Sequence, residues 1–229
     1  MNSKIVKDMP VAAALPKRIE RLNDLAYNLW WAWEPEAINL FKQIDPITWD
    51  AVSHNPIEML RRTARALLNQ KSNDKDFVGA YDSVIKKFDE YMNRKDTWFN
   101  VHYPEVKDKT ISYFSFEFGL HESIPAYAGG LGILAGDHLK ESSDMGLPLA
   151  AIGFIYNEGY FVQKITEDGW QETSNFHLDF STLPMIPLTD EKGKEHRNFR
   201  VAPGTRYLCT CLVDAGWARS ALPPRYGVR

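Results

Sequence analysis

The sequence predicts an α/β protein in which an all-helical N-terminal module, residues 1–100, precedes a parallel β-sheet. In the first hundred residues apolar side chains recur at steps of three and four, which is the period of an amphipathic helix. Further along, the buried-type strands Ile111–Phe116 and Leu149–Tyr156 enclose a helix-like segment, Ile133–Met145. Strand, helix and strand in this order predict a βαβ unit, whose two strands run parallel.

The first predicted helix carries an apolar stripe from Ile19 to Trp33 and ends before Pro35, because a residue that precedes proline is biased away from helix. Trp30 lies on this stripe with Trp33, so we expect both in the core. Trp31 points elsewhere on the helix, and we expect it to contact a neighbouring domain. A carbohydrate-stacking platform is the alternative role, but indoles on a leucine stripe more often form core.

Proline pairs predict the starts of two further helices. In Asp45-Pro46 and Asn55-Pro56 a capping side chain precedes a proline suited to the first helical position. Apolar spacing predicts helices over residues 36–43, 57–69 and 76–93, and a linker over residues 93–109.

Strand signals dominate the segment that follows the βαβ unit. Residues 160–165 and 170–173 flank Glu167-Asp168-Gly169, which is typical of a hairpin turn. An extended stretch is predicted at 183–188, and two further strands at 199–201 and 207–213.

Composition excludes several classes of function. The net charge is −3, from 27 basic and 30 acidic residues, and no basic run indicates nucleic-acid binding. No apolar run has the length of a membrane span, so we expect a cytoplasmic protein that binds no membrane. Cys209 and Cys211 are too few for a disulfide framework and lack a second pair, so we expect reduced thiols and no metal site.

A glycine-rich loop joins the first strand to the helix. Glu117 ends the strand, and Gly129, Gly130, Leu131 and Gly132 lead into the helix. The first N–H groups of a helix lack intrahelical partners, and glycines let an anion approach them. The spacing is not G-x-G-x-x-G, so a tight strand-to-helix entry without a ligand is an equally weighted alternative.

Further polar residues flank this loop. His121 and Glu122 precede it, and Asp137 and His138 follow it; they can orient a sugar, a phosphate or each other. For Asp137 and His138 the polar face of a helix is the favoured interpretation. Glu117 is more informative, because a carboxylate at the end of a buried strand needs a partner or a function.

The motifs of this region resemble those of the α-glucan (glycogen/maltodextrin) phosphorylases, in particular their bacterial and archaeal subfamily. The resemblance rests on residues 113–123, 128–140, 153–164 and 168–172. The leading residues 25–33 and 44–46 resemble the helical extension of that subfamily, and the similarity continues to about Leu212.

The resemblance implies a two-lobed glycosyltransferase fold of the GT-B type, of which residues 101–213 form an incomplete first Rossmann-like lobe. It implies reversible phosphorolysis of α-1,4-glucan by inorganic phosphate, which releases glucose 1-phosphate. Pyridoxal phosphate supplies its own phosphate as acid/base partner, and the full-length family is often homo-oligomeric. The glycine loop at Gly129, Gly130 and Leu131 then lines the site where phosphate and glucosyl unit meet, with Glu117 beside it; no catalytic residue is assigned to this chain.

The chain departs from the family in two ways. The family's chain is several times longer, and the lysine that binds pyridoxal phosphate lies in its second lobe. We therefore expect this chain alone neither to bind the cofactor covalently nor to turn over. Residues 214–229, with Pro223-Pro224, lack strand alternation, so we expect a frameshift or gene fragment that begins between Arg206 and Asp214.

The sequence leaves two alternative functions open. A glycogen or starch synthase-like enzyme has a similar glycine loop and uses a nucleotide-sugar donor, but it lacks the long helical leader. The second alternative is a non-catalytic glucan-binding protein built from the first lobe. Retention on a maltodextrin affinity column without enzymatic activity would support it.

Overall fold

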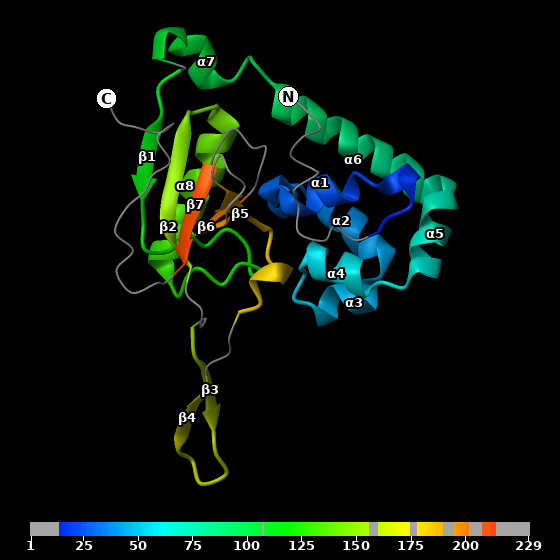
Figure 1. The fold of residues 1–229 in the computed structure, drawn as a ribbon, viewed down its shortest axis with the longest axis vertical. Helices are drawn as coiled ribbons and strands as arrows, with labels where there is room; N and C mark the ends of the chain where they lie inside the picture. The colour runs from blue at the N-terminus through cyan, green and yellow to red at the C-terminus, as the bar shows by residue number, and fades with distance from the viewer. Residues whose placement is uncertain are drawn as a thin grey trace.

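The chain forms a bundle of helices beside a mixed β-sheet that is flanked by helix α8 (Figure 1). The computed structural model describes residues 14–106, 108–155, 160–174, 178–189, 195–201 and 208–213. The helices are η2 (Lys17–Ile19), α1 (Leu22–Tyr27), η3 (Leu29–Trp33), α2 (Pro35–Ile44), α3 (Pro46–Ala51), α4 (Pro56–Arg62), α5 (Arg65–Asn73), α6 (Lys75–Asn93), α7 (Trp98–His102), η4 (Pro104–Val106), α8 (Gly130–Met145) and η5 (Phe180–Thr182). The strands are β1 (Ile111–Phe114), β2 (Leu149–Ile155), β3 (Val162–Ile165), β4 (Gln171–Ser174), β5 (Met185–Thr189), β6 (Glu195–Val201) and β7 (Leu208–Val213).

The five-stranded sheet has the order β1-β2-β7-β6-β5. β1 pairs with β2 in parallel, with Ile111 opposite Leu149, and β2 pairs with β7 in parallel. The predicted βαβ unit and the α/β class are therefore confirmed. β5 and β6 are added in antiparallel fashion. The predicted hairpin, β3–β4, is a separate two-stranded sheet that turns at Gly169 (φ 83°) and projects away from the rest (Figure 1).

The first strand differs from its prediction. It ends at Phe114 rather than Phe116, and Ile111 and Phe114 are 44% and 67% exposed. The apolar run predicted burial on both faces, but β1 is at the edge of the described sheet. Only Tyr113 is partly buried, where its ring lies 5.1 Å from that of His138 on α8.

Side-chain hydrogen bonds divide two of the predicted helices. The stripe from residue 19 to residue 33 is not one helix, because Asn28 is extended (φ −104°, ψ 118°) and its Oδ1 accepts from the Trp30 N–H at 3.0 Å. The predicted helix 57–69 breaks at Thr63, whose hydroxyl donates to the Met59 carbonyl at 2.8 Å. Short polar side chains that bond to nearby backbone compete with helix, and the apolar period does not register this. The predicted linker 93–109 likewise contains α7 and η4.

The predicted proline-marked helix starts are confirmed. Asp45 precedes α3 and its Oδ1 accepts from the Thr48 N–H at 3.1 Å. Asn55 precedes α4, and its Oδ1 accepts from the N–H groups of Ile57 and Glu58. Its amide nitrogen also donates to the Thr182 carbonyl at 2.8 Å, so Asn55 joins the helical module to the segment before β5.

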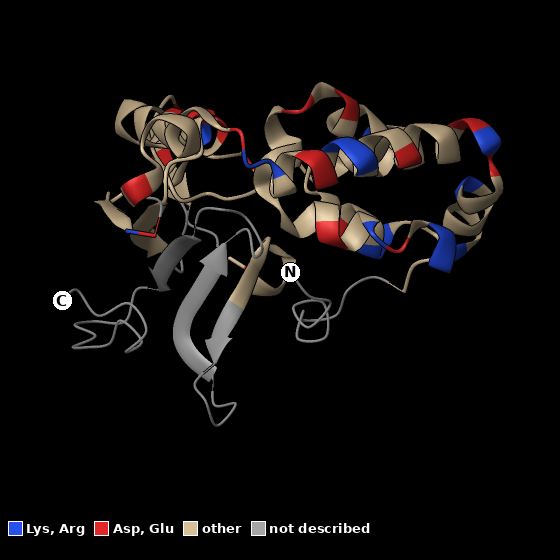
Figure 2. Ribbon diagram, turned by 90° about the horizontal axis from the view of Figure 1, so that it is seen from above, with Lys and Arg blue, Asp and Glu red and all other residues tan. Residues whose placement is uncertain are grey.

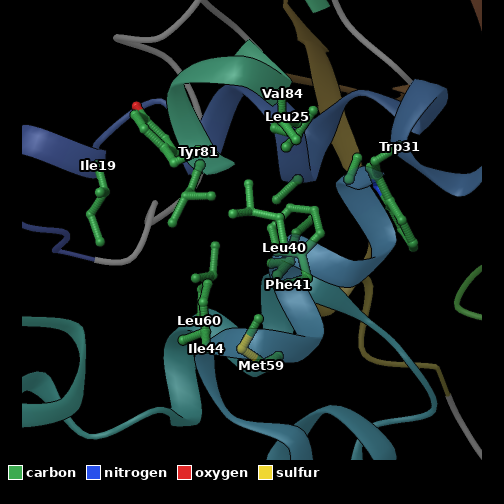
Figure 3. Close-up of a cluster of buried hydrophobic side chains, with 14 of the residues drawn as sticks. Ile19, Leu25, Trp31, Leu40, Phe41, Ile44, Met59, Leu60, Tyr81 and Val84 are labelled. Carbon is green, nitrogen blue, oxygen red and sulfur yellow. The ribbon is translucent and has the colours of Figure 1, made fainter. Parts of the chain in front are cut away.

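The core of the helical module gathers side chains from α1 to α6 (Figure 3). Trp30 is buried as predicted, whereas Trp33 is only partly buried. Trp31 was not expected in this core but is fully buried in it, with its ring 5.7 Å from Phe41 and 5.9 Å from Trp49. Its ring also lies 4.6 Å from that of His121, which is outside the helical module, so the expected contact beyond the module is present. Buried indoles cannot stack on a sugar, so the carbohydrate-platform alternative fails for Trp30 and Trp31.

A second core lies between α8 and the sheet and receives side chains from the helical module. Leu29 is one of its buried members, and Trp33 packs against both cores. The hydroxyl of Tyr91 on α6 donates to a carboxylate oxygen of Asp144 on α8 at 2.8 Å. The helical module and the sheet are therefore in direct apolar and polar contact.

Acidic and basic residues are interspersed along the helices of the module (Figure 2). Within the described ranges, no helix combines the length and the apolar character needed to cross a bilayer. The predicted tail 214–229 and the side chains of Cys209 and Cys211 are outside the residues described.

Replacement of Asn55 by alanine should lower the free energy of unfolding by about 2–3 kcal/mol, because it removes a helix cap and leaves the Thr182 carbonyl without its donor. Asp74→Ala removes only a helix cap, the exposed one of α6, and should lower the free energy of unfolding by about 1 kcal/mol. Urea denaturation of both variants gives the comparison, and equal losses would contradict the linking role of Asn55.

Candidate anion site at the glycine loop

Helix α8 begins at the glycine loop, three residues before the predicted start. Its N-cap is Gly129, and no described side chain caps it. Gly129, Gly130 and Leu131 are exposed. An exposed helix start without a side-chain cap leaves N–H donors and the positive end of the helix dipole available to an external acceptor.

Glu117 lies against this helix start. Its Oε2 accepts a hydrogen bond from the Ala128 N–H at 3.2 Å, and a Cβ added to Gly132 would lie 3.1 Å from the same oxygen. The turn that brings Glu117 here is closed by Ser115, whose hydroxyl donates to the Glu117 carbonyl at 2.8 Å. The structure thus places the predicted carboxylate beside the predicted glycines, and Glu117 has a backbone partner within the loop.

A close backbone contact holds the strand end against α8. The N–H of Gly119 donates to the carbonyl of Gly132 at 2.7 Å. A Cβ at Gly136 would lie 2.1 Å from the Gly119 carbonyl oxygen, and one at Gly132 would lie 2.4 Å from the Tyr127 Cβ. Gly132 and Gly136 are therefore required by packing.

Gly119 and Gly136 were missed as site-building residues in the sequence. The signal that would have found Gly136 is its position in a helix interior, where glycine costs about 0.5–1 kcal/mol relative to alanine and so needs a reason. The reason here is the passage of the Gly119 backbone across the helix.

His121 and Glu122 face the helical module. The His121 ring lies 4.6 Å from the Trp31 ring, and its Nδ1 accepts from the Ser123 N–H at 3.1 Å. Glu122 pairs with Nδ1 of His54, from the turn between α3 and α4. In this structure both predicted residues therefore make contacts within the protein.

Burial lowers the pKa of His121 to about 4. The charges of His54 and Lys140 act in the same direction, and only the nearby Glu122 carboxylate opposes them. His121 is therefore neutral near pH 7, and its neutral Nδ1 is able to accept the Ser123 N–H.

Asp137 and His138 are not brought to the loop. Both are exposed on α8, and Asp137 lies about 10 Å along the helix from Gly130, given a rise of about 1.5 Å per residue. The interpretation of these residues as a polar helix face agrees with the structure.

Apolar side chains surround the helix start on the surface. Leu131 and Leu134 are 57% and 69% exposed. The exposed rings of Phe116 and Phe154 stack at 5.7 Å between centroids, just beyond β1 and near the end of β2.

Comparison with known proteins gives consistent matches. A family model described as "Protein of unknown function (DUF3417)" matches residues 15–124. The maltodextrin phosphorylase of Thermococcus litoralis is 45% identical over 184 residues, 80% of this chain and 22% of that protein. The glycogen phosphorylase of Aquifex aeolicus is 45% identical over 175 residues, 76% of this chain and 24% of that protein. That of Mycobacterium tuberculosis is 41% identical over 199 residues, 83% of this chain and 22% of that protein.

This chain is homologous to part of the α-glucan phosphorylases. The resemblance seen in the sequence motifs is thereby confirmed. The chain spans about a quarter of the length of these phosphorylases. No solved structure matches the chain.

Gly136→Ala should destabilise the fold by about 2–3 kcal/mol, because its Cβ would overlap the Gly119 carbonyl and neither backbone can move freely. Gly79→Ala is the matched control, since Gly79 is also inside a helix but a Cβ there meets nothing within 4 Å. The control should stabilise the protein by about 0.5–1 kcal/mol. Thermal and urea denaturation measure both, and a stabilising Gly136→Ala would refute the close contact.

Stability should fall as the pH drops from about 6.5 to about 4, because the unfolded chain protonates His121 near its ordinary pKa while the folded chain resists until about 4. For this partly exposed ring we expect a loss of about 1–2 kcal/mol. His121→Gln should flatten the pH dependence of the free energy of unfolding in that window. An unchanged slope in the His121 variant would argue against the burial of this ring.

Proposed function

We propose that this chain forms part of an α-glucan phosphorylase, in which it supplies the loop that binds the phosphate and glucosyl groups. The reaction is the phosphorolysis of α-1,4-glucan, with inorganic phosphate as second substrate and glucose 1-phosphate as product. The named phosphorylase relatives support the reaction class. The glycine loop beside the N-terminus of α8 supports the location.

The observation that carries this proposal is the open space at Gly129 and Gly130. A Cβ added to either residue meets nothing within 4 Å, and neither has a positive φ. Packing and backbone conformation therefore do not require glycine there, unlike at Gly132 and Gly136. Close approach of a ligand to the helix N–H groups provides the reason. Gly79 has equally open surroundings, but it lies inside α6, far in sequence from any helix start.

Glu117 and the backbone donors have complementary roles in this proposal. The N–H groups at the start of α8 bind anionic oxygens. The Glu117 carboxylate repels a bare anion, so it accepts from a sugar hydroxyl or from a protonated phosphate oxygen. Its hydrogen bond from the Ala128 N–H holds it at the rim of the loop. The pair thus selects a sugar phosphate over a simple anion.

The residues at the loop do not fit the cofactor of the family. Pyridoxal phosphate needs a lysine for its covalent anchor, and the nearest lysine in sequence, Lys140, is about 15 Å along α8 from Gly130. We therefore assign no contact with pyridoxal phosphate to this chain and propose that the rest of the enzyme holds it.

We also propose that residues 101–213 belong to the first Rossmann-like lobe of a GT-B glycosyltransferase, preceded by the helical module of residues 1–100. The parallel strands β1, β2 and β7 with the crossover helix α8 support this. A cytoplasmic, homo-oligomeric enzyme is part of the same proposal. The synthase-like alternative gains no support from the named phosphorylase relatives.

A chimera tests the proposal. Residues 1–213 replace the matching segment of the Thermococcus litoralis maltodextrin phosphorylase, and glucose 1-phosphate release from maltodextrin and phosphate is measured. We expect activity. A soluble chimera that binds pyridoxal phosphate but releases no glucose 1-phosphate would contradict the proposed function.

The loop is tested in the same chimera by Gly130→Val. The added Cβ meets nothing within 4 Å in the protein, whereas the side chain obstructs a ligand at the helix start, so the KM for phosphate should rise by about tenfold or more while the melting temperature changes little. Gly79→Ala serves as the control with unchanged KM. An unchanged KM for Gly130→Val would remove the loop from the binding site.

A further inference from the structure

The turn between α3 and α4 has an unusual backbone. Ser53 and His54 have φ values of 50° and 56°, in the left-handed region that residues with a Cβ seldom occupy. Such conformations cost free energy and persist where the surroundings hold them. Here the turn directs the His54 ring to Glu122, which lies outside the helical module, and places it 5.3 Å from the Trp49 ring.

A second contact lies beside the first. The His121 ring meets the fully buried Trp31 at 4.6 Å, closer than Trp31 approaches Phe41 or Trp49. Among the described residues the Trp31 indole N–H is buried and has no hydrogen-bond partner. His121 is itself fixed through Ser123, whose N–H donates to its Nδ1.

The same segment reaches the glycine loop at its other end. The Ile124 N–H donates to the His121 carbonyl at 2.9 Å, and the Phe118 N–H donates to the Ala126 carbonyl at 3.0 Å. These bonds fold residues 117–126 into one unit. That unit contacts the first turn of α8 through the Gly119 N–H and the glycine loop through the Glu117 carboxylate, which accepts from the Ala128 N–H. Contacts therefore run without a gap from the helical module to the start of α8.

We propose that the helical module acts as a positioning device for the glycine loop, and that His54, Glu122 and His121 are its positioning residues. The region matched by the family model of unknown function, residues 15–124, contains both sides of this contact. The identity of the ligand that the loop binds rests on the proposed function, whereas the positioning of the loop by the helical module does not. Loss of the contact frees residues 117–136 to fluctuate and leaves the two cores intact.

Amide hydrogen exchange of the ligand-free chain tests the proposal. Glu122→Ala should speed exchange across residues 117–136 by about threefold, as expected for loss of one exposed ion pair. His54→Asn should do the same, because asparagine tolerates the left-handed backbone while it loses the ring contacts. The double variant should exchange no faster than His54→Asn alone, since that variant already removes the contact with Glu122.

The control is Glu36→Ala, which breaks the ion pair of Glu36 with Lys87 inside the helical module. The exposures of the two carboxylate side chains, 53% for Glu36 and 50% for Glu122, are matched. This control should leave exchange over residues 117–136 unchanged and lower the melting temperature as much as Glu122→Ala does. Equal exchange in Glu122→Ala and Glu36→Ala, or additive effects in the double variant, would overturn the proposal.

The exchange experiment uses the chain without ligand, so its outcome tests the positioning independently of the proposed function. In the chimera, Glu122→Ala should raise the KM for phosphate about threefold with kcat little changed, whereas Glu36→Ala should change neither. If Glu122→Ala speeds exchange in the chain but the chimera releases no glucose 1-phosphate, the proposed function is refuted and the positioning is supported. If Glu122→Ala leaves exchange in the chain unaltered but the chimera is active, the positioning is refuted and the proposed function is supported.

Discussion

The contact between the Gly119 backbone and the first turns of α8 is the constraint on which the rest of this region depends. The 2.7 Å bond from the Gly119 N–H to the Gly132 carbonyl and the lack of a Cβ at Gly136 allow the two backbones to touch. That touch fixes where the chain leaves β1 and where α8 begins. Glu117 and the exposed glycines acquire their mutual geometry from it. The candidate anion site is therefore a consequence of the packing at Gly119, two residues after Glu117.

The helical module takes part in the same geometry. Leu29 enters the core between α8 and the sheet, and Asn55 and Tyr91 add polar contacts across the boundary. A boundary this well connected transmits the position of one part to the other. The module is thus a structural support of the glycine loop, and the arrangement gives a physical reason for its place directly before that loop in the sequence.

Much of this architecture could be predicted from the sequence, and the failures have identifiable causes. Periodicity and proline pairs gave α2, α3, α6 and the βαβ unit, because these elements depend on local signals. The breaks at Asn28 and Thr63 depend on single side-chain hydrogen bonds that an apolar period does not contain. The burial of Trp31 was mispredicted because η3 is a 3-10 helix, which changes the direction of each side chain.

The candidate site likewise contains residues that the sequence could predict and contacts that it could not. The glycines and Glu117 were predictable, because strand-to-helix loops have a recognisable composition. The partners of His121 and Glu122 were not, since they come from residues 31 and 54, far away in the sequence. Distant contacts of this kind require the fold, and no spacing within the motif indicates them.

The most direct test of the central claim is an NMR titration of the 15N-labelled chain with glucose 1-phosphate, followed at the backbone amides. We expect saturable shifts, at millimolar ligand, centred on the amides of Gly130 and Leu131 with smaller shifts at Ala128. Shifts that are absent, or that are centred away from the start of α8, would contradict the claim.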